Sequence, residues 1–182
     1  HKPFAIMVAT LDDACAICDV LPEAEALLTS PQAPIVLLDR RPALLVDDVA
    51  PGHHTLGVML PSTPLHHILL RDVGRPLIMT SGNLSEEPIA MDNAEALERL
   101  APLADAFLLH NRDIHARYDD SVVQITNGKP EMANGKKPSS DLPFTICHFQ
   151  FLRRARGYAP FPIQLPFELP QTFAAGPLLK NT

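Results

Sequence analysis

Small polar side chains are concentrated in one short stretch of this sequence, Thr80–Pro88, which follows an apolar run, Pro76–Met79, that predicts a short buried strand. Its hydroxyl and amide side chains are those of Thr80, Ser81, Asn83 and Ser85. In open α/β sheets, ligands bind beyond the carboxyl ends of strands. These side chains, together with backbone N–H groups freed at Gly82, can cradle a polyanion or a nucleotide without a titratable group. The same residue types are common in plain connecting loops, so both interpretations stay open.

Three arginines, Arg153, Arg154 and Arg156, follow a strand expected around His148–Leu152. They concentrate positive charge in a chain whose formal net charge is −6. Guanidinium groups bind phosphate oxygens in a fork-like geometry, so the cluster is a candidate anion site. Salt bridges to surface acids are the alternative.

A third candidate is the run Asp119-Asp120-Ser121, which leads directly into a strand expected over Ser121–Thr126. Its carboxylates could orient an arginine or hold Mg²⁺ at triphosphate oxygens, and the Ser121 hydroxyl could donate to a phosphate. A solvated turn is the alternative.

Other patterns give little support for catalysis by a metal or a nucleophile. Cys15 and Cys18 form a lone pair separated by two residues on a predicted helix, where packing in the core is favoured over zinc or redox chemistry. The histidines lack the spacing of a metal site. The sequence also contains no Walker loop, nucleophile elbow or dinucleotide-binding glycine motif. We therefore predict no metal ligand and no covalent catalytic residue.

Composition limits the remaining classes of protein. The 182 residues are 46% hydrophobic, which suits one domain with a substantial core. We expect a cytoplasmic protein without a membrane partner, because no apolar run of spanning length and no secretory leader is visible. The acidic balance argues against a general nucleic-acid coat, although a local anion site remains compatible with it.

Strands and helices are expected to alternate along the chain, which implies an α/β sheet. The expected strands lie within His1–Ala9 and over Ile35–Asp39, Thr55–Leu60, Pro76–Met79, Ala106–Leu109, Ser121–Thr126 and about His148–Leu152. The expected helices run from Leu11 to about Val20, over Glu23–Leu28, from Pro64 to Gly74 and from Asn93 to about Leu100. Thr10 and Asp92 are suitable N-caps, either Ser62 or Thr63 can cap the helix that begins at Pro64, and Gly74 suits a helix end. The polar stretch from Lys129 to about Pro143 predicts a loop.

Five segments together closely resemble the YrdC-like domain of the HypF family of hydrogenase maturation factors. They are Lys2–Phe4, Leu60–His67, Thr80–Ser85, Asp119–Val123 and Arg153–Pro160. Their order and spacing agree with that family up to Pro166, apart from one insertion. The resemblance implies a YrdC-type α/β fold, a twisted sheet with flanking helices around a concave cavity.

The resemblance also implies an activity, a cofactor set and partners. The YrdC-like domain of such proteins joins carbamate to ATP, accompanied by Mg²⁺, and forms carbamoyl-adenylate and pyrophosphate. The following domain passes the carbamoyl group to the C-terminal cysteine of HypE, a step in hydrogenase maturation. By motif, the residues implied to hold the nucleotide and the carbamoyl end are Lys2, Thr80, Ser81, Asn83, Ser85, Ser121, Arg154 and Arg156.

The same resemblance predicts the domain organisation. Residues 1–167 are expected to be the carbamoyl-adenylate-forming domain, N-terminally incomplete, with an inserted loop near 129–150. Residues 168–182 are expected to be a linker and the start of a carbamoyltransferase domain. Because the missing part carries a strand and a basic segment in that family, we expect the piece alone to bind ATP weakly and to lack activity.

Two other functions stay open. Threonylcarbamoyl-adenylate synthases for tRNA modification share the Ser-x-Asn motif and have been linked to double-stranded RNA, but a net charge of −6 does not favour RNA binding. The chain could also be a non-catalytic scaffold between the neighbouring domains. Adenylate formation that depends on carbamate would exclude the scaffold.

Overall fold

The computed structural model describes residues 3–41, 47–84, 87–126 and 148–162, which belong to two compact units. The first unit comprises residues 1–79 and 120–157, and the second comprises residues 80–119 and 158–182. The loop expected from Lys129 to about Pro143, the linker expected at 168–182, Lys2 and Ser85 all lie outside the described residues. The insertion expected near 129–150 lies outside them as well, except for its last three residues, which belong to a strand. The described part of the chain contains no helix that is long and apolar enough to cross a membrane.

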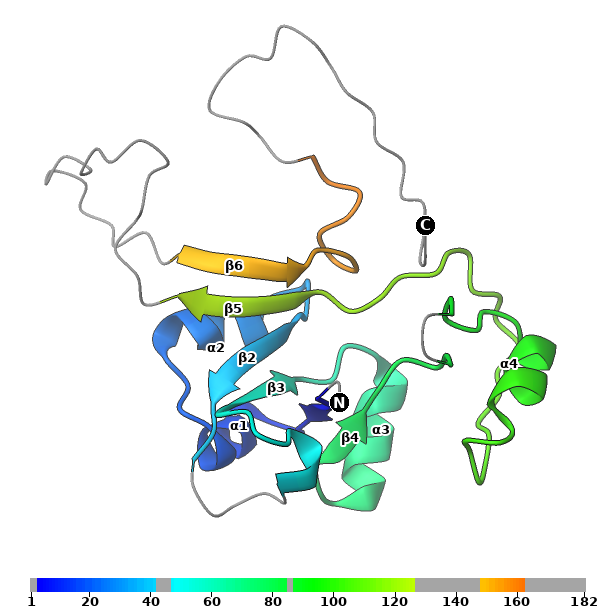
Figure 1. Ribbon diagram of the computed structural model, residues 1–182, viewed down its shortest axis with the longest axis horizontal. Helices are drawn as coiled ribbons and strands as arrows, with labels where there is room; N and C mark the ends of the chain where they lie inside the picture. Colours follow the sequence, from blue (N-terminus) through cyan, green and yellow to red (C-terminus); the bar gives the residue numbers. More distant parts are fainter. Residues whose placement is uncertain (1–2, 42–46, 85–86, 127–147, 163–182) are drawn as a thin grey trace, which may run out of the picture. The chain divides into compact units, whose positions relative to one another are not determined.

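The first unit is built on a six-stranded mixed sheet with the order β4-β1-β3-β2-β5-β6 (Figure 1). The strands are β1 (Ala5–Met7), β2 (Ile35–Asp39), β3 (Thr55–Met59), β4 (Leu77–Met79), β5 (Val122–Thr126) and β6 (His148–Arg153). β1 is parallel to β3 and β2 is parallel to β5, whereas the other neighbouring strands are antiparallel. The α/β fold class predicted from the sequence is therefore confirmed.

Capping residues fix the helices close to where the sequence predicts them. The helices are α1 (Leu11–Ile17), α2 (Pro22–Leu28), α3 (Pro64–Val73) and α4 (Asn93–Leu100), and a short 3₁₀ helix covers Asp47–Val49. Thr10 caps α1 and forms a capping box with Asp13. Thr63 accepts from the His66 N–H at the start of α3, and Gly74 ends that helix at φ 67°.

Helices cover both faces of the sheet. Ala14 of α1 and Leu28 of α2 pack into one buried cluster with Val36 and Val58 of the central strands. Leu70 of α3 joins a second cluster with Met7 and Met59. Because neighbouring residues of a strand point to opposite faces, Met59 and Val58 assign α3 to one face and α1 with α2 to the other.

Three details of the expected secondary structure are wrong. α1 ends at Ile17 instead of near Val20, because Cys18 leaves the helix to form a bridge with Arg40. β4 is an edge strand rather than a buried one, and its Ile78 side chain is 59% exposed. Ala106–Leu109 forms no strand, because its apolar residues find no partner strand and Leu108 stays 68% exposed.

The second unit contains α4 and long irregular segments on either side of it (Figure 1). Asp92 caps α4 by accepting from the N–H groups of Ala94 and Glu95. None of the described residues of this unit, 80–84, 87–119 and 158–162, is buried. Hydrogen bonds and ion pairs therefore connect these residues without a core of fully buried side chains among them.

Candidate functional site

One end of the sheet in the first unit gathers several polar residues. β6 ends at Arg153, which pairs with Val122, the first residue of β5. Asp120 and Ser121 come just before β5, and the turn through Arg156 follows β6. β1 and β3 also end at this side, because β1 is parallel to β3 and β3 is antiparallel to β2.

The hydroxyl group of Ser121 is hydrogen-bonded to the backbone of the turn that contains Arg156. Its side chain is 1% exposed, and its hydroxyl donates to the Arg156 carbonyl at 2.9 Å. The same oxygen accepts the Ala155 N–H at 2.8 Å. The structure therefore gives Ser121 a structural role toward the backbone of the turn, and its direct contact with a ligand stays a prediction.

Arg156 is oriented by two acceptors from distant parts of the chain. Its Nε and Nη2 atoms donate to Oδ1 of Asp120 at 2.9 and 2.6 Å, and Nη2 also approaches the Ala33 carbonyl at 3.3 Å. Of the two roles that the sequence left open for the aspartates, the structure shows the orientation of an arginine by Asp120. Among the described residues no acceptor contacts Nη1, so both of its N–H groups remain for a ligand.

Gly157 allows the turn to approach the segment before β2. Its φ is +84°, a conformation that side chains disfavour, and a Cβ there would lie 2.7 Å from the Gln32 carbonyl oxygen. The Gln32 Cα would be equally close, at 2.8 Å. Only glycine fits this backbone contact, which neighbours the Ala33 carbonyl that orients Arg156.

His66 adds an imidazole to the electrostatic environment of Arg156. Its Nδ1 accepts the Ser62 N–H at 3.4 Å, which leaves the proton of a neutral ring on Nε2. Burial lowers the pKa of His66 below its usual value, and the Arg156 guanidinium lowers it further. Asp120 acts in the opposite direction but does not offset them. His66 is therefore neutral at pH 7.

In the second unit, Asn83 organises the turn that follows β4. Its Nδ2 donates to the carbonyls of Leu84, at 2.6 Å, and Glu87, at 3.0 Å. The Oδ1 atom is buried and has no hydrogen-bond partner among the described residues. A buried acceptor without a hydrogen bond lowers the stability of the folded state. A ligand N–H or O–H group would supply the missing donor.

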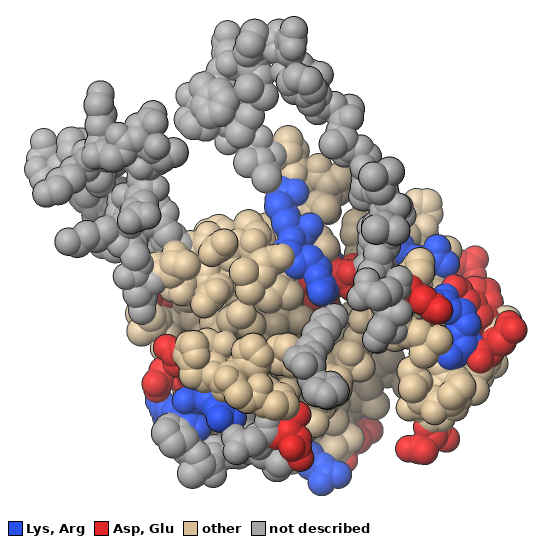
Figure 2. Space-filling view, viewed as in Figure 1, with Lys and Arg blue, Asp and Glu red and all other residues tan. Residues whose placement is uncertain are grey.

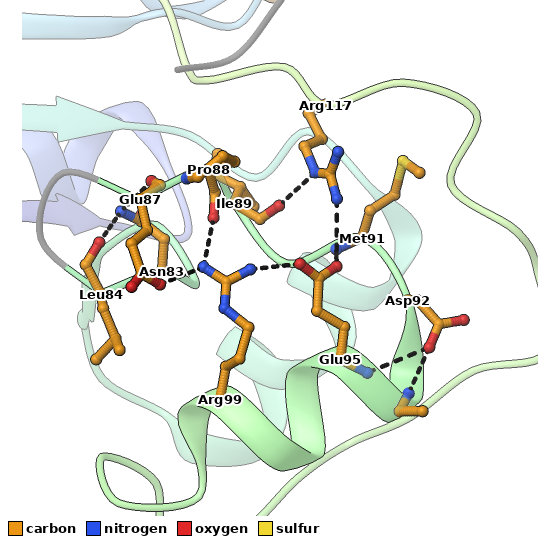
Figure 3. Close-up of polar contacts among 11 residues, drawn as sticks. Asn83, Leu84, Glu87, Pro88, Ile89, Met91, Asp92, Glu95, Arg99 and Arg117 are labelled. Atoms are coloured by element: carbon orange, nitrogen blue, oxygen red, sulfur yellow. Dashed lines mark hydrogen bonds and ion pairs between the residues drawn. The ribbon is translucent and has the colours of Figure 1, made fainter. Parts of the chain in front are cut away.

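The segment Glu87–Met91, which follows this turn, is held by a network of charged side chains from α4 and from Arg117 (Figure 3). Arg99 donates to the carboxylates of Glu87 and Glu95, and it also reaches the Pro88 carbonyl. Arg117 donates to the Ile89 carbonyl at 2.8 Å and to Glu95 at 3.3 Å. Glu95 also accepts the Met91 N–H at 3.0 Å.

These contacts keep Glu95 ionised. The Met91 N–H, and with it the side chains of Arg99 and Arg117, lowers the pKa of Glu95 to about 2. The network of two arginines and two glutamates is then electrically balanced at neutral pH. Its arginines are committed to carboxylates.

The structure divides the site residues predicted from the sequence between the two units. Ser121, Arg154 and Arg156 belong to the first unit, where the Ser121 hydroxyl contacts the backbone of the turn that carries Arg156. Thr80, Ser81 and Asn83 belong to the second unit. β4 runs antiparallel to β1, so the rule that places ligands at the ends of parallel strands does not apply to the loop after it.

Sequence reasoning missed several residues that shape these sites. Ala33 matters through its backbone carbonyl, which no motif records. Gly157 lies inside a recognised segment, but its close approach to Gln32 was not predicted. Arg99 lies on a helix that was expected only to pack. His66 lies in the segment Leu60–His67, which carries the family resemblance, but no function was predicted for its side chain from the sequence. The spacing of Arg99 and Glu95, one helical turn apart, was the one available signal for the charged network.

The described side chains show no broad anion-binding face in the view of Figure 2. The basic atoms there form small separate groups, and acidic atoms lie beside each of them. Within the described ranges, no group of three or more histidine, cysteine, aspartate or glutamate side chains could hold a metal ion. The anion-binding potential is therefore local and rests on turns such as that of Arg156.

The fold and these turns define the class of protein. The family model named Sua5_yciO_yrdC, described as "Telomere recombination", matches residues 1–134, so this chain belongs to the Sua5/YciO/YrdC family.

Within that family, the resemblance to the YrdC-like domain of HypF is confirmed. The chain is 46% identical over 166 residues to carbamoyltransferase HypF of Synechocystis sp., covering 91% of this chain and 19% of that protein. It is also 46% identical over 182 residues to carbamoyltransferase HypF of Rhodobacter capsulatus, covering 98% of this chain and 22% of that protein. The chain thus spans about a fifth of the length of these relatives.

Solved structures agree with this assignment. A crystal structure of full-length HypF in the phosphate- and nucleotide-bound form superposes with a TM-score of 0.76 at 45% identity, covering 91% of this chain and 23% of that chain. HypF of T. kodakarensis gives a TM-score of 0.78 at 39% identity, covering 92% of this chain and 20% of that chain. P. abyssi Sua5 complexed with L-threonine, at 16% identity and a TM-score of 0.57, shares the fold over 68% of this chain and 37% of its own.

Proposed function

We propose that this chain is the part of a HypF-type carbamoyltransferase that activates carbamate with ATP. A carbamate oxygen attacks the α-phosphorus, the bond from that phosphorus to the α–β bridging oxygen breaks, and pyrophosphate leaves. The product is carbamoyl-adenylate. In the proposed complete protein, the carbamoyl group then passes to a HypE-like acceptor during hydrogenase maturation.

The observation that supports this proposal most directly is the orientation of Arg156. Asp120 and the Ala33 carbonyl occupy Nε and Nη2, and no acceptor among the residues that the structure describes contacts Nη1, whose two protons we assign to an anion. A fixed guanidinium stabilises charge that develops on phosphate oxygens without reorganising during the reaction. A nucleotide is accordingly the anion that we assign to this turn. The similar full-length HypF structure named above is a phosphate- and nucleotide-bound form, which supports a nucleotide as the ligand.

Other residues have supporting roles in this proposal. The unpaired Oδ1 of Asn83 would accept a donor from the adenylate or the carbamoyl amide. Arg154, together with Lys2, would bind the triphosphate. Thr80, Ser81 and Ser85 would contribute polar side chains from the loop after β4 to nucleotide binding. Mg²⁺ would arrive with ATP, because this ion usually keeps water ligands and binds substrate phosphates rather than a protein cage.

ATP–pyrophosphate exchange tests the proposal in the full-length polypeptide that carries this sequence. Carbamate is supplied from ammonium bicarbonate, and threonine with bicarbonate forms the comparison. We expect exchange with carbamate alone, its loss in Arg156→Ala, and a decrease to a measurable residual rate in Asn83→Ala. Arg71→Ala is the matched control, since Arg71 is exposed on α3 and, within the described ranges, pairs with its neighbour Asp72 alone.

The other outcomes separate the rival functions. Exchange that requires threonine would assign the chain to threonylcarbamoyl-adenylate formation. Exchange with neither substrate would leave the scaffold role, provided that the protein is folded by circular dichroism.

A further inference from the structure

We propose that Arg99 is a positioning residue for Asn83: it fixes the segment Glu87–Met91, against which the Asn83 amide is held. The inference rests on the proposed function, because it assigns Asn83 to ligand binding. It concerns residues of the second unit alone.

The path from Arg99 to Asn83 consists of short, direct contacts (Figure 3). Arg99 binds the Glu87 carboxylate and, at 3.2 Å, the Pro88 carbonyl. The Glu87 carbonyl accepts Nδ2 of Asn83 at 3.0 Å. The residue that Arg99 restrains is thus the residue that orients the Asn83 side chain.

The same segment also holds the backbone beside Asn83. The Ala90 N–H donates to the Gly82 carbonyl at 2.9 Å, and the Glu87 N–H donates to the Leu84 carbonyl at 3.1 Å. Arg117 and Glu95 fix the far end of the segment through Ile89 and Met91. Since no described residue of this unit is buried, apolar packing cannot replace these contacts.

Arg99 itself is unsuited to binding the nucleotide phosphates. Its Nη1 and Nη2 atoms already donate to Glu95 and Glu87, and only 23% of its side chain is exposed. A phosphate there would have to displace two carboxylates. The guanidinium shape is nevertheless required, because a lysine ammonium cannot bridge both glutamates and the Pro88 carbonyl with the same planar fork.

A double-mutant cycle with Asn83 tests this role in the full-length polypeptide. We expect Arg99→Ala to raise the KM for ATP in carbamate-dependent exchange by about tenfold or more, because a small displacement of a binding group has effects of this size. Arg99→Lys should recover only part of the loss. In an Asn83→Ala background, Arg99→Ala should change KM by less than about twofold, because residues that act as a unit are non-additive.

Arg112→Ala is the matched control, since Arg112 is exposed in the same unit and its side chain contacts none of these groups. Equal effects of Arg99→Ala with and without Asn83 would overturn the proposal, because Arg99 would then act independently of Asn83. An unchanged KM in Arg99→Ala would overturn it as well.

Hydrogen exchange provides a readout that needs no ligand. We expect Arg99→Ala to accelerate exchange of the Glu87 and Ala90 amides by about tenfold, because both amides belong to the segment that Arg99 fixes. Arg112→Ala should leave their exchange unchanged. Unchanged exchange would overturn the positioning role. If the unaltered protein showed no ATP–pyrophosphate exchange, the proposed function would fail, whereas the amide exchange would still decide whether Arg99 holds this turn.

Discussion

At the scale of single residues, Gly157 controls how closely the arginine turn can approach the chain before β2. We expect Gly157→Ala to lower the free energy of unfolding by about 2–4 kcal/mol, the sum of a left-handed backbone conformation and a backbone clash. The clash is with the Gln32 carbonyl and Cα, which cannot move aside as a side-chain tip could. Urea unfolding followed by circular dichroism measures the change.

Gly52→Ala separates the two contributions in Gly157→Ala. Gly52 has a φ of +70°, but nothing lies within 4 Å of a Cβ built there. This control should lose only about 1 kcal/mol, the conformational part of the effect. Equal losses at both positions would show that the approach to Gln32 carries no energetic weight.

His66 predicts a dependence of stability on pH. Its folded-state pKa lies below the ordinary 6.5 because of burial and the nearby Arg156. The unfolded chain therefore binds a proton at a higher pH than the folded chain. The contribution of His66 to stability is complete above pH 6.5 and is lost as the pH falls through the lowered pKa.

We expect His66→Gln to make the free energy of unfolding decline less steeply between pH 7.5 and pH 5, as measured by urea unfolding at several pH values. His53→Gln is the control, because His53 is an exposed histidine that is not among the groups acting on His66. The groups that act on the His66 imidazole are Arg156, Asp120 and His67. A slope that stays unchanged in His66→Gln would contradict the burial of a neutral ring.

Residue types alone indicated that Asp120 could orient an arginine, but not which one. Arg156 lies 36 positions further along the chain, and its contact depends on the antiparallel pairing of β5 with β6. Ser121 illustrates the opposite limit. Its hydroxyl suggested a ligand contact, yet its burial and its two backbone partners follow from the turn geometry, which no local pattern contains.

At the scale of elements, the helix ends that carry a capping residue were predictable because their signals are local, whereas the end of α1 at Ile17 was not. Thr10, Thr63, Gly74 and Asp92 all act where the sequence places a cap. Strands were less certain, since a strand exists only with a neighbour. The apolar run Ala106–Leu109 has strand-like composition but no partner, and β4 is identified as an edge only by the sheet order.

Glu95, in the first turn of α4, should keep its ion pairs with Arg99 and Arg117 in moderately acidic solution. Glu95 keeps its charge down to about pH 2, whereas an unfolded glutamate takes up a proton near 4.5. Its contribution to stability is therefore complete above pH 4.5 and is lost progressively as the pH falls toward about 2. We expect Glu95→Gln to lower the thermal midpoint at pH 7, and the difference from the unaltered chain to shrink toward pH 2.

Glu98→Gln is the matched control for that measurement, because Glu98 is exposed on the same helix. Far-UV circular dichroism at a series of pH values provides the midpoints. A difference between Glu95→Gln and the unaltered chain that stayed constant down to pH 2 would show that the effect is not due to the Glu95 charge.

At the scale of the whole molecule, the two units differ in how they are stabilised. The first contains two buried clusters, whereas none of the described residues of the second is buried. Apolar burial is the main favourable contribution to folding, so a unit that depends on ion pairs opens at lower cost. In the absence of ligand, amides of α4 should exchange at least about tenfold faster than those of β3.

Ligand binding provides a second test at this scale. A ligand that binds only the folded state stabilises that state by mass action, by about 2.7 kcal/mol at a concentration of 100 times its Kd. A non-hydrolysable ATP analogue with Mg²⁺ should therefore slow exchange of the Ala155 amide, which donates to Ser121 in the arginine turn, and Arg156→Ala should abolish this protection. Unchanged exchange of Ala155 with the analogue would contradict the assignment of the nucleotide to this turn, and equal exchange of α4 and β3 without ligand would contradict the assigned difference in stability.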